Sequence, residues 1–126
     1  MFTLLQDWTT LQGTGVGSFS QSATKWLDLQ AYRDAIFWLE VSALTTVSTE
    51  LYMNYETAPI ADADLFAPMV TEFLMAAAAT PVVTKVLLSQ GPSCPVAGFV
   101  RWRIRANAAA VWRVTFRVHC LGKWKG

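Results

Sequence analysis

Two stretches near the end of the chain alternate strictly between apolar and arginine side chains, and no other feature limits the fold as much. They are Phe99–Arg105 and Val111–Val118. Successive side chains of a β-strand point to opposite faces, so each stretch predicts a strand with one apolar and one basic face. The apolar positions are Val100, Trp102, Ile104, Trp112, Val114, Phe116 and Val118, and the basic positions are Arg101, Arg103, Arg105, Arg113 and Arg117.

We expect these two strands to pair as a β-hairpin. A turn centred on Ala108 would place Trp102 opposite Val114 and Arg103 opposite Arg113. All the arginines would then share one face of the hairpin. Such a face needs carboxylates, solvent or a binding partner to offset its charge.

Other alternating segments predict further strands. They are Lys25–Gln30, Ala35–Ala43, Val47–Glu56 and Val82–Leu88. Met69–Met75 fits a strand or a helix, and we choose a strand because its neighbours are strands. Prolines mark a loop over residues 57–68, where Asp62 or Asp64 suits the start of a helical turn. The spacing of these elements predicts an all-β fold, a single β-sandwich or jelly-roll-like domain.

A second predicted hairpin joins Ala35–Ala43 to Val47–Glu56 through a turn near Thr45. Its pairing would put Trp38 beside Tyr52 and Glu40 beside Glu50. Opposed carboxylates are one arrangement of glycosidase chemistry. An ion-pair network with the arginines explains the two glutamates better.

The first residues of the chain have a different character from the rest. Residues 1–24 are predicted to form an extended N-terminal arm ahead of a β-sandwich domain over residues 25–126. The arm combines scattered apolar side chains with a Gly- and Ser-rich stretch over residues 13–22, which suits an extended linker. Either a neighbouring subunit holds this arm or it packs along its own domain.

Composition indicates one domain that offers apolar surface to other proteins. The chain has 126 residues, of which 53% are hydrophobic and 15% charged. No apolar run reaches the length of a membrane span and no basic region opens a signal peptide, so we expect a cytosolic chain with Cys94 and Cys120 reduced. A net charge of +1 argues against nucleic acid or an anionic membrane as the partner.

No constellation of catalytic or metal-binding residues stands out. His119 and Cys120 are neighbours on a predicted strand, so their side chains would point to opposite faces. The glycines of Gly13–Gly17 lack the lysine of a phosphate-binding loop. Asp62 and Asp64 could contribute to a calcium site, but no EF-type loop surrounds them. We therefore predict a protein without catalytic residues, cofactor or metal.

Several segments together resemble a known class of viral protein. They are Trp26–Leu29, Asp34–Val41, Tyr55–Pro59, Asp62–Phe66, Phe99–Ile104 and Val114–Val118. In these segments the chain is similar to the small β-sandwich decoration (cement) proteins on the capsids of tailed bacteriophages. The resemblance implies copies made in the host cytoplasm that bind the major capsid protein on the outside of the virion, often as trimers or dimers. They clamp adjacent capsomers without any catalysis.

Two sets of residues are the candidates for this contact. Apolar residues of the arm would anchor it on the shell or on an adjacent copy, and part of the arginine face would meet acidic capsid surface. The candidates are Phe2, Leu4, Leu5, Trp8, Arg101, Arg103, Arg113 and Arg117. The alternative function is a carbohydrate-binding module, in which Trp38 and Tyr52 would form a platform for a sugar ring.

Overall fold

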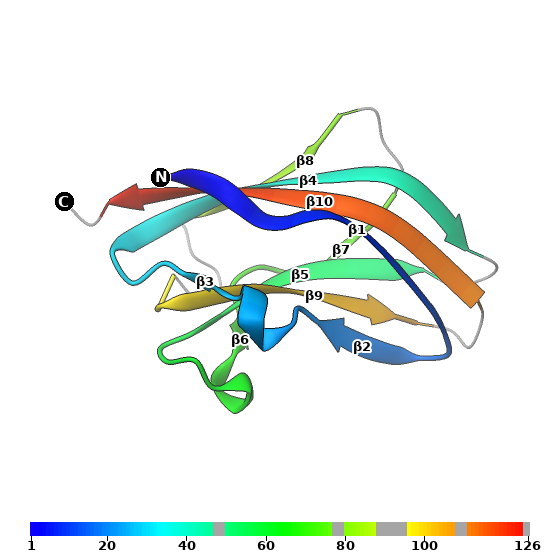
Figure 1. Ribbon diagram of the computed structural model, residues 1–126, viewed down its shortest axis with the longest axis horizontal. Coiled ribbons are helices and arrows are strands. Elements are labelled where there is room, and N and C mark those ends of the chain that lie inside the picture. The colour runs from blue at the N-terminus through cyan, green and yellow to red at the C-terminus, as the bar shows by residue number, and fades with distance from the viewer. Residues whose placement is uncertain (47–49, 77–79, 88–95, 108–110, 125–126) are drawn as a thin grey trace.

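Two antiparallel β-sheets stack face to face in the computed structural model, which describes residues 1–46, 50–76, 80–87, 96–107 and 111–124 (Figure 1). The only helical elements among these residues are two short 3-10 turns, η1 (Ala23–Lys25) and η2 (Ala63–Leu65). The predicted fold class, an all-β sandwich, is therefore confirmed. No helix in the described ranges is long and apolar enough to cross a membrane.

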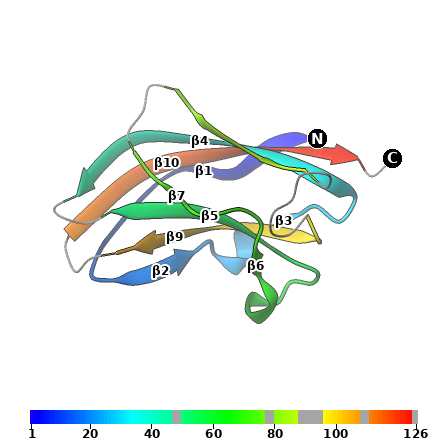
Figure 2. The ribbon, with the colours of Figure 1, turned by 180° about the vertical axis from the view of Figure 1, so that it is seen from behind.

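Each sheet draws its strands from distant parts of the chain. Sheet A has the order β1-β10-β4-β8, and sheet B has the order β2-β9-β5-β6. The strands of sheet A are β1 (Phe2–Thr14), β10 (Val111–Trp124), β4 (Tyr32–Thr46) and β8 (Val82–Val86). Those of sheet B are β2 (Gly17–Ser20), β9 (Phe99–Ala106), β5 (Leu51–Ala58) and β6 (Ala67–Pro68), with β3 (Leu27–Asp28) added to β9 and β7 (Phe73–Leu74) added to β5. Figure 2 shows β6 and β7 from the side on which they flank β5.

The core lies between the two sheets and is built from the alternating strands. The predicted apolar positions of β9 and β10 are all buried, and Trp102 meets Phe116 edge to face at 5.2 Å between ring centres. From β4 and β5, Phe37 stacks on Tyr55 at 4.2 Å. Full burial of such side chains is the main stabilising term of a sandwich.

The predicted hairpins are wrong, because in each case the two strands belong to different sheets. β9 pairs with β5 and β10 pairs with β4, so the chain crosses from one sheet to the other between β9 and β10, and again between β4 and β5. Arg103 lies opposite Asn54 rather than Arg113, and Glu40 lies opposite Arg117 rather than Glu50. Alternation determines which side chains face inward. It does not determine which strand lies alongside.

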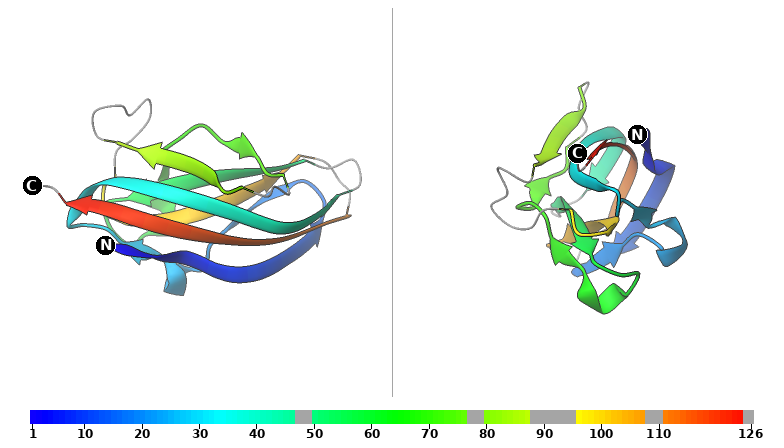
Figure 3. Two further views of the ribbon diagram at one scale, coloured as in Figure 1. Left: turned by 90° about the horizontal axis from the view of Figure 1, so that it is seen from above. Right: turned by 90° about the vertical axis from the view of Figure 1, so that its left-hand side faces the viewer.

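Residues 1–24 run along the domain itself, which is the second of the two alternatives for the arm. β1 pairs with β10 at the margin of sheet A, and β2 pairs with β9 in sheet B (Figure 3). Between them the chain turns at Gly15, whose φ of 100° favours glycine. Leu5 is buried in the core. The segment is largely extended and contributes one strand to each sheet.

Smaller predictions have mixed outcomes. The segment 69–75 contains the short strand β7, and the side chain of Asp62 accepts a hydrogen bond from the Asp64 amide at the start of η2, as predicted. Cys120 is a buried free thiol, and this burial raises its pKa to about 12. Cys94 lies outside the described residues.

Candidate functional site

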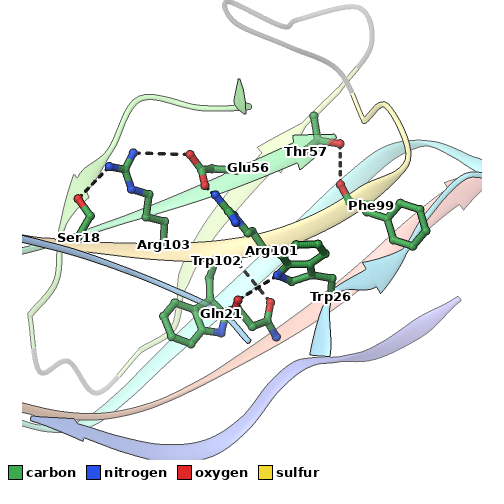
Figure 4. A network of polar contacts seen from close by, with 9 residues as sticks. All are labelled: Ser18, Gln21, Trp26, Glu56, Thr57, Phe99, Arg101, Trp102 and Arg103. Carbon is green, nitrogen blue, oxygen red and sulfur yellow. Dashed lines mark hydrogen bonds and ion pairs between the residues drawn. The ribbon is translucent and has the colours of Figure 1, made fainter. Parts of the chain in front are cut away.

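The outer face of sheet B carries the three arginines of β9, and each of them contacts a carboxylate. Arg101 donates from Nε to Glu56 Oε1 at 2.9 Å, and Arg103 Nη1 lies 3.6 Å from Glu56 Oε2. Figure 4 shows Glu56 between these two guanidinium groups. Arg105 donates to both carboxylate oxygens of Glu72, at distances of 2.6 to 3.1 Å. This face therefore supplies its own counter-charges.

Aromatic rings close the site around Arg101. Its guanidinium carbon lies 4.0 Å from the centre of the Phe66 ring and 5.6 Å from that of Trp26. The indole of Trp26 donates to the carbonyl of Gln21, in the segment between β2 and η1, at 2.9 Å, and this hydrogen bond holds the ring in place (Figure 4). Glu56 is only 3% exposed. A carboxylate this deeply buried requires a permanent cationic partner, and Arg101 is that partner.

The third pair on this face is more open. Arg105 lies over the Tyr52 ring, with its guanidinium carbon 4.6 Å from the ring centre. Its side-chain hydrogen bonds to Glu72 lower the pKa of that carboxyl below the ordinary value of 4.5. Both side chains keep about two fifths of their surface exposed, at 41% and 37%. Solvent screens such a pair strongly.

The outer face of sheet A has one polar cluster at its centre. Arg117 Nη2 lies 2.8 Å from Glu40 Oε2, and His119 Nδ1 lies 3.1 Å from Glu40 Oε1. Arg117 also lies over the Trp8 ring at 4.6 Å. The cluster ties β4, β10 and β1 together across the middle of the sheet.

Apolar side chains surround this cluster. Phe2 stacks on His119 at 5.3 Å and meets Trp38 edge-on at 5.8 Å. We define the apolar patch as four large exposed side chains of this face together with Trp38. Its members are Phe2 (62% exposed), Leu4 (38%), Trp8 (43%), Val83 (48%) and Trp38, which is half-buried. The patch thus has members on β1, β4 and β8, and large exposed apolar side chains that gather on one face are typical of contact sites.

The structure separates the predicted contact residues into three groups. Phe2, Leu4 and Trp8 come together in the apolar patch, and Leu5 is in the core, where it cannot contact a partner. Arg113 and Arg117 lie on the outer face of sheet A, whereas Arg101 and Arg103 lie on sheet B. The single face with five arginines therefore does not exist.

The predicted sugar platform is not assembled. Trp38 points outward from β4 in sheet A, and Tyr52 points outward from β5 in sheet B, so the two rings lie on opposite sides of the molecule. Trp38 instead neighbours Phe2.

Sequence reasoning missed Val83 and His119 as members of the sheet A face. A usable signal was charge complementarity, because Glu40 is the register partner of Arg117 and Glu56 is the register partner of Arg101. Pairing the strands by opposite charge would have placed β4 beside β10 and exposed the true composition of each face.

No three His, Cys, Asp or Glu side chains among the described residues gather where a metal ion could be held. His119 faces outward and Cys120 faces the core, as the strand period predicts.

Comparisons with known proteins bear on the fold. No protein-family model matches the chain, and no curated protein matches its sequence. The fold is similar to that of a chain in a solved structure of infectious bursal disease virus, Gx strain, with a TM-score of 0.58 and 11% sequence identity. The similarity covers 100% of this chain and 33% of that chain, so this chain spans about a third of the viral protein. At this identity the likeness shows a shared fold.

Proposed function

We propose that this protein is a structural component of a virus particle, which attaches to the outside of a capsid through the apolar patch on sheet A. The observation that carries the proposal is the patch itself, in which exposed apolar side chains of β1 and β8 share one face with the half-buried Trp38 of β4. The viral source of the structural neighbour and the resemblance to tailed-phage decoration proteins support the choice of partner.

The composition of the patch suits a protein partner. Stable interfaces place aromatic residues and arginine at their centre, and the patch combines Phe2, Trp8 and Trp38 with Arg117. A contact surface on one small domain binds its partner with modest affinity. Many copies on a symmetric shell act together, so weak contacts are sufficient to hold adjacent capsomers.

In this proposal the partner is the major capsid protein of a tailed phage, and the protein works as a homo-oligomer, a trimer or dimer, at positions where capsomers meet. Binding and clamping are its whole activity. Neither nucleic acid nor a membrane takes part.

The test is binding to empty, expanded capsids of the virus that encodes the protein. Phe2→Ser and Val83→Ser each remove one exposed apolar side chain from the patch, at opposite margins of sheet A. We expect occupancy of the shell, measured by co-sedimentation, to fall by about tenfold in each variant, since one buried apolar anchor contributes roughly 1.5 kcal/mol. Thermal unfolding should change little.

The matched control is Ile60→Ser, because Ile60 is 56% exposed in the loop after β5, away from sheet A. We expect it to bind shells like the wild type. Equal losses in all three variants, or full occupancy in all three, would contradict the assignment of the patch.

A further inference from the structure

β1 is the outermost strand of sheet A, and its outer side is open. It pairs with β10 on one side, and no other strand of the described part pairs with it (Figure 3). The strand is 13 residues long. A long edge strand presents a row of unpaired backbone N–H and C=O groups, which is a template for another strand.

The first half of this edge is blocked. Register shifts interrupt the ladder between Leu4 and Gln6 and again between Gln6 and Thr9. The Leu5 carbonyl accepts a hydrogen bond from the Gln21 side chain at 2.6 Å, and the Asp7 carbonyl accepts one from the Gln6 side chain at 2.9 Å. Bulges and occupied carbonyls prevent regular pairing with an incoming strand.

The second half, Thr9–Thr14, has no such protection. Its register with β10 is regular, and its six residues include no charge and no proline. The other edge strands are short or guarded. β8 has five residues with the exposed Lys85 among them, β2 has four residues, and β6 has two residues, one of which is Pro68. Among the described strands, only β1 therefore offers a long regular edge.

We propose that Thr9–Thr14 pairs with the same segment of a second copy of this chain. The two strands run antiparallel about a two-fold axis, so the outer N–H and C=O groups of each satisfy those of the other. The two four-stranded sheets then form one continuous sheet. A segment without charge meets its own copy without repulsion between like charges, which makes self-pairing favourable.

Antiparallel pairing centred on Gln12 sets Gln12 opposite its own copy and brings Thr10 of one chain opposite Thr14 of the other at both ends, within the part of β1 whose register is regular. Threonine is favoured in strands, and none of the side chains that meet carries a charge. The inference does not depend on the proposed function, because the pairing is a property of the purified protein alone.

The test uses two substitutions that add the same charge beside the same arginine. Gln12 and Thr45 are both register partners of Arg113, one on the edge strand β1 and one on the interior strand β4. Gln12→Glu places two carboxylates near each other across the two-fold axis, whereas Thr45→Glu adds its charge away from the edge. In both variants Arg113 offsets the new charge within the single chain.

We expect sedimentation equilibrium to give the wild type a mass that approaches twice the 14.0 kDa of the chain as concentration rises. Gln12→Glu should raise the dissociation constant of the dimer by at least about tenfold, since opposed like charges are costly at an interface. Thr45→Glu should leave it unchanged. Amides within Thr9–Thr14 should exchange with solvent more slowly in the dimer than in Gln12→Glu.

Four results would overturn the inference. They are a wild type that stays monomeric up to about 1 mM, self-association into trimers, an equal effect of both substitutions, and concentration-dependent protection at another edge. Circular dichroism must show the same thermal unfolding in both variants, which ensures that loss of the dimer is not loss of the fold.

Discussion

The outer faces of the two sheets use the same residue types in opposite ways. On sheet B, Arg101 is enclosed by Glu56, Trp26 and Phe66, and it keeps only 12% of its side-chain surface. On sheet A, Arg117 pairs with Glu40 and lies over Trp8, yet it keeps 28%. An arginine that lies against aromatic rings is thus largely shielded from solvent on sheet B, whereas on sheet A it remains partly exposed.

The difference shows that composition alone does not identify a contact surface. Arg101 and Arg105 each pair with a carboxylate and lie against aromatic rings, and Arg103 shares Glu56 with Arg101, so a partner would gain little from them. The apolar patch of sheet A leaves its rings partly uncovered, so a partner that buries them gains their transfer free energy. Under the proposed function, sheet A is therefore the docking face, and the arginines of sheet B contribute to stability.

The largest expected effect concerns Arg101, the shielded arginine of sheet B. Arg101→Met keeps a long side chain between Phe66 and Trp26 and removes the charge that Glu56 needs. We expect it to lower the free energy of unfolding by about 3 kcal/mol, the low end of the usual cost of removing the partner of a buried carboxylate, because Glu56 keeps only Arg103 at 3.6 Å. Chemical denaturation with urea measures the change.

The matched substitution on the open side is Arg117→Met. Because Glu40 and Arg117 are both partly exposed, we expect it to cost less than about 1 kcal/mol. Equal losses in the two variants would mean that the faces do not differ in the way described.

A smaller expected effect is the difference in strength between the cation–π contacts of Arg101 and Arg117. Double-mutant cycles between Arg101 and Phe66, and between Arg117 and Trp8, isolate each cation–π contact from the packing around it. We expect a coupling of about 1–2 kcal/mol for the first pair, whose charge is shielded from water, and about 0.5 kcal/mol for the second. A larger coupling on sheet A would reverse the comparison.

The inward faces of the strands could be predicted from alternation within each strand, whereas their neighbours could be found only by comparing charges between strands. The alternation in Phe99–Arg105 and Val111–Val118 identifies the buried residues of β9 and β10 correctly, because burial depends on the strand period alone. A short connection between two such strands closes a hairpin or crosses to the opposite sheet, and both leave the same pattern. The predicted hairpins put arginine against arginine and glutamate against glutamate, and that repulsion was the sign of incorrect pairing.

The candidate site follows the same rule. The sequence predicts Phe2, Leu4 and Trp8 as contact residues from their apolar character in a segment with no evident core pattern, and the structure places all three on one exposed face. Val83 joins them only because β8 lies beside β4, which is a long-range pairing that no local pattern encodes. Leu5 was misassigned because it follows the outward-facing Leu4 on β1, and the strand period turns its side chain into the core.

The smallest expected effect concerns Arg105 and Glu72, the partly exposed ion pair on the outer face of sheet B. Hydrogen bonds from Arg105 lower the folded-state pKa of Glu72 below 4.5, so the ionised carboxylate favours the folded state. Its contribution is fully present above the ordinary pKa and is lost as the pH falls through the lowered folded-state value. The stability difference between the wild type and Glu72→Gln should therefore be constant near neutral pH and shrink below about pH 4.5. Arg105→Gln removes the same pair and should reproduce this profile in thermal unfolding experiments. A stability difference that persists unchanged into strong acid would show that Glu72 stabilises the fold through packing. Arg105 and Glu72 would then be as well shielded from solvent as Arg101 is.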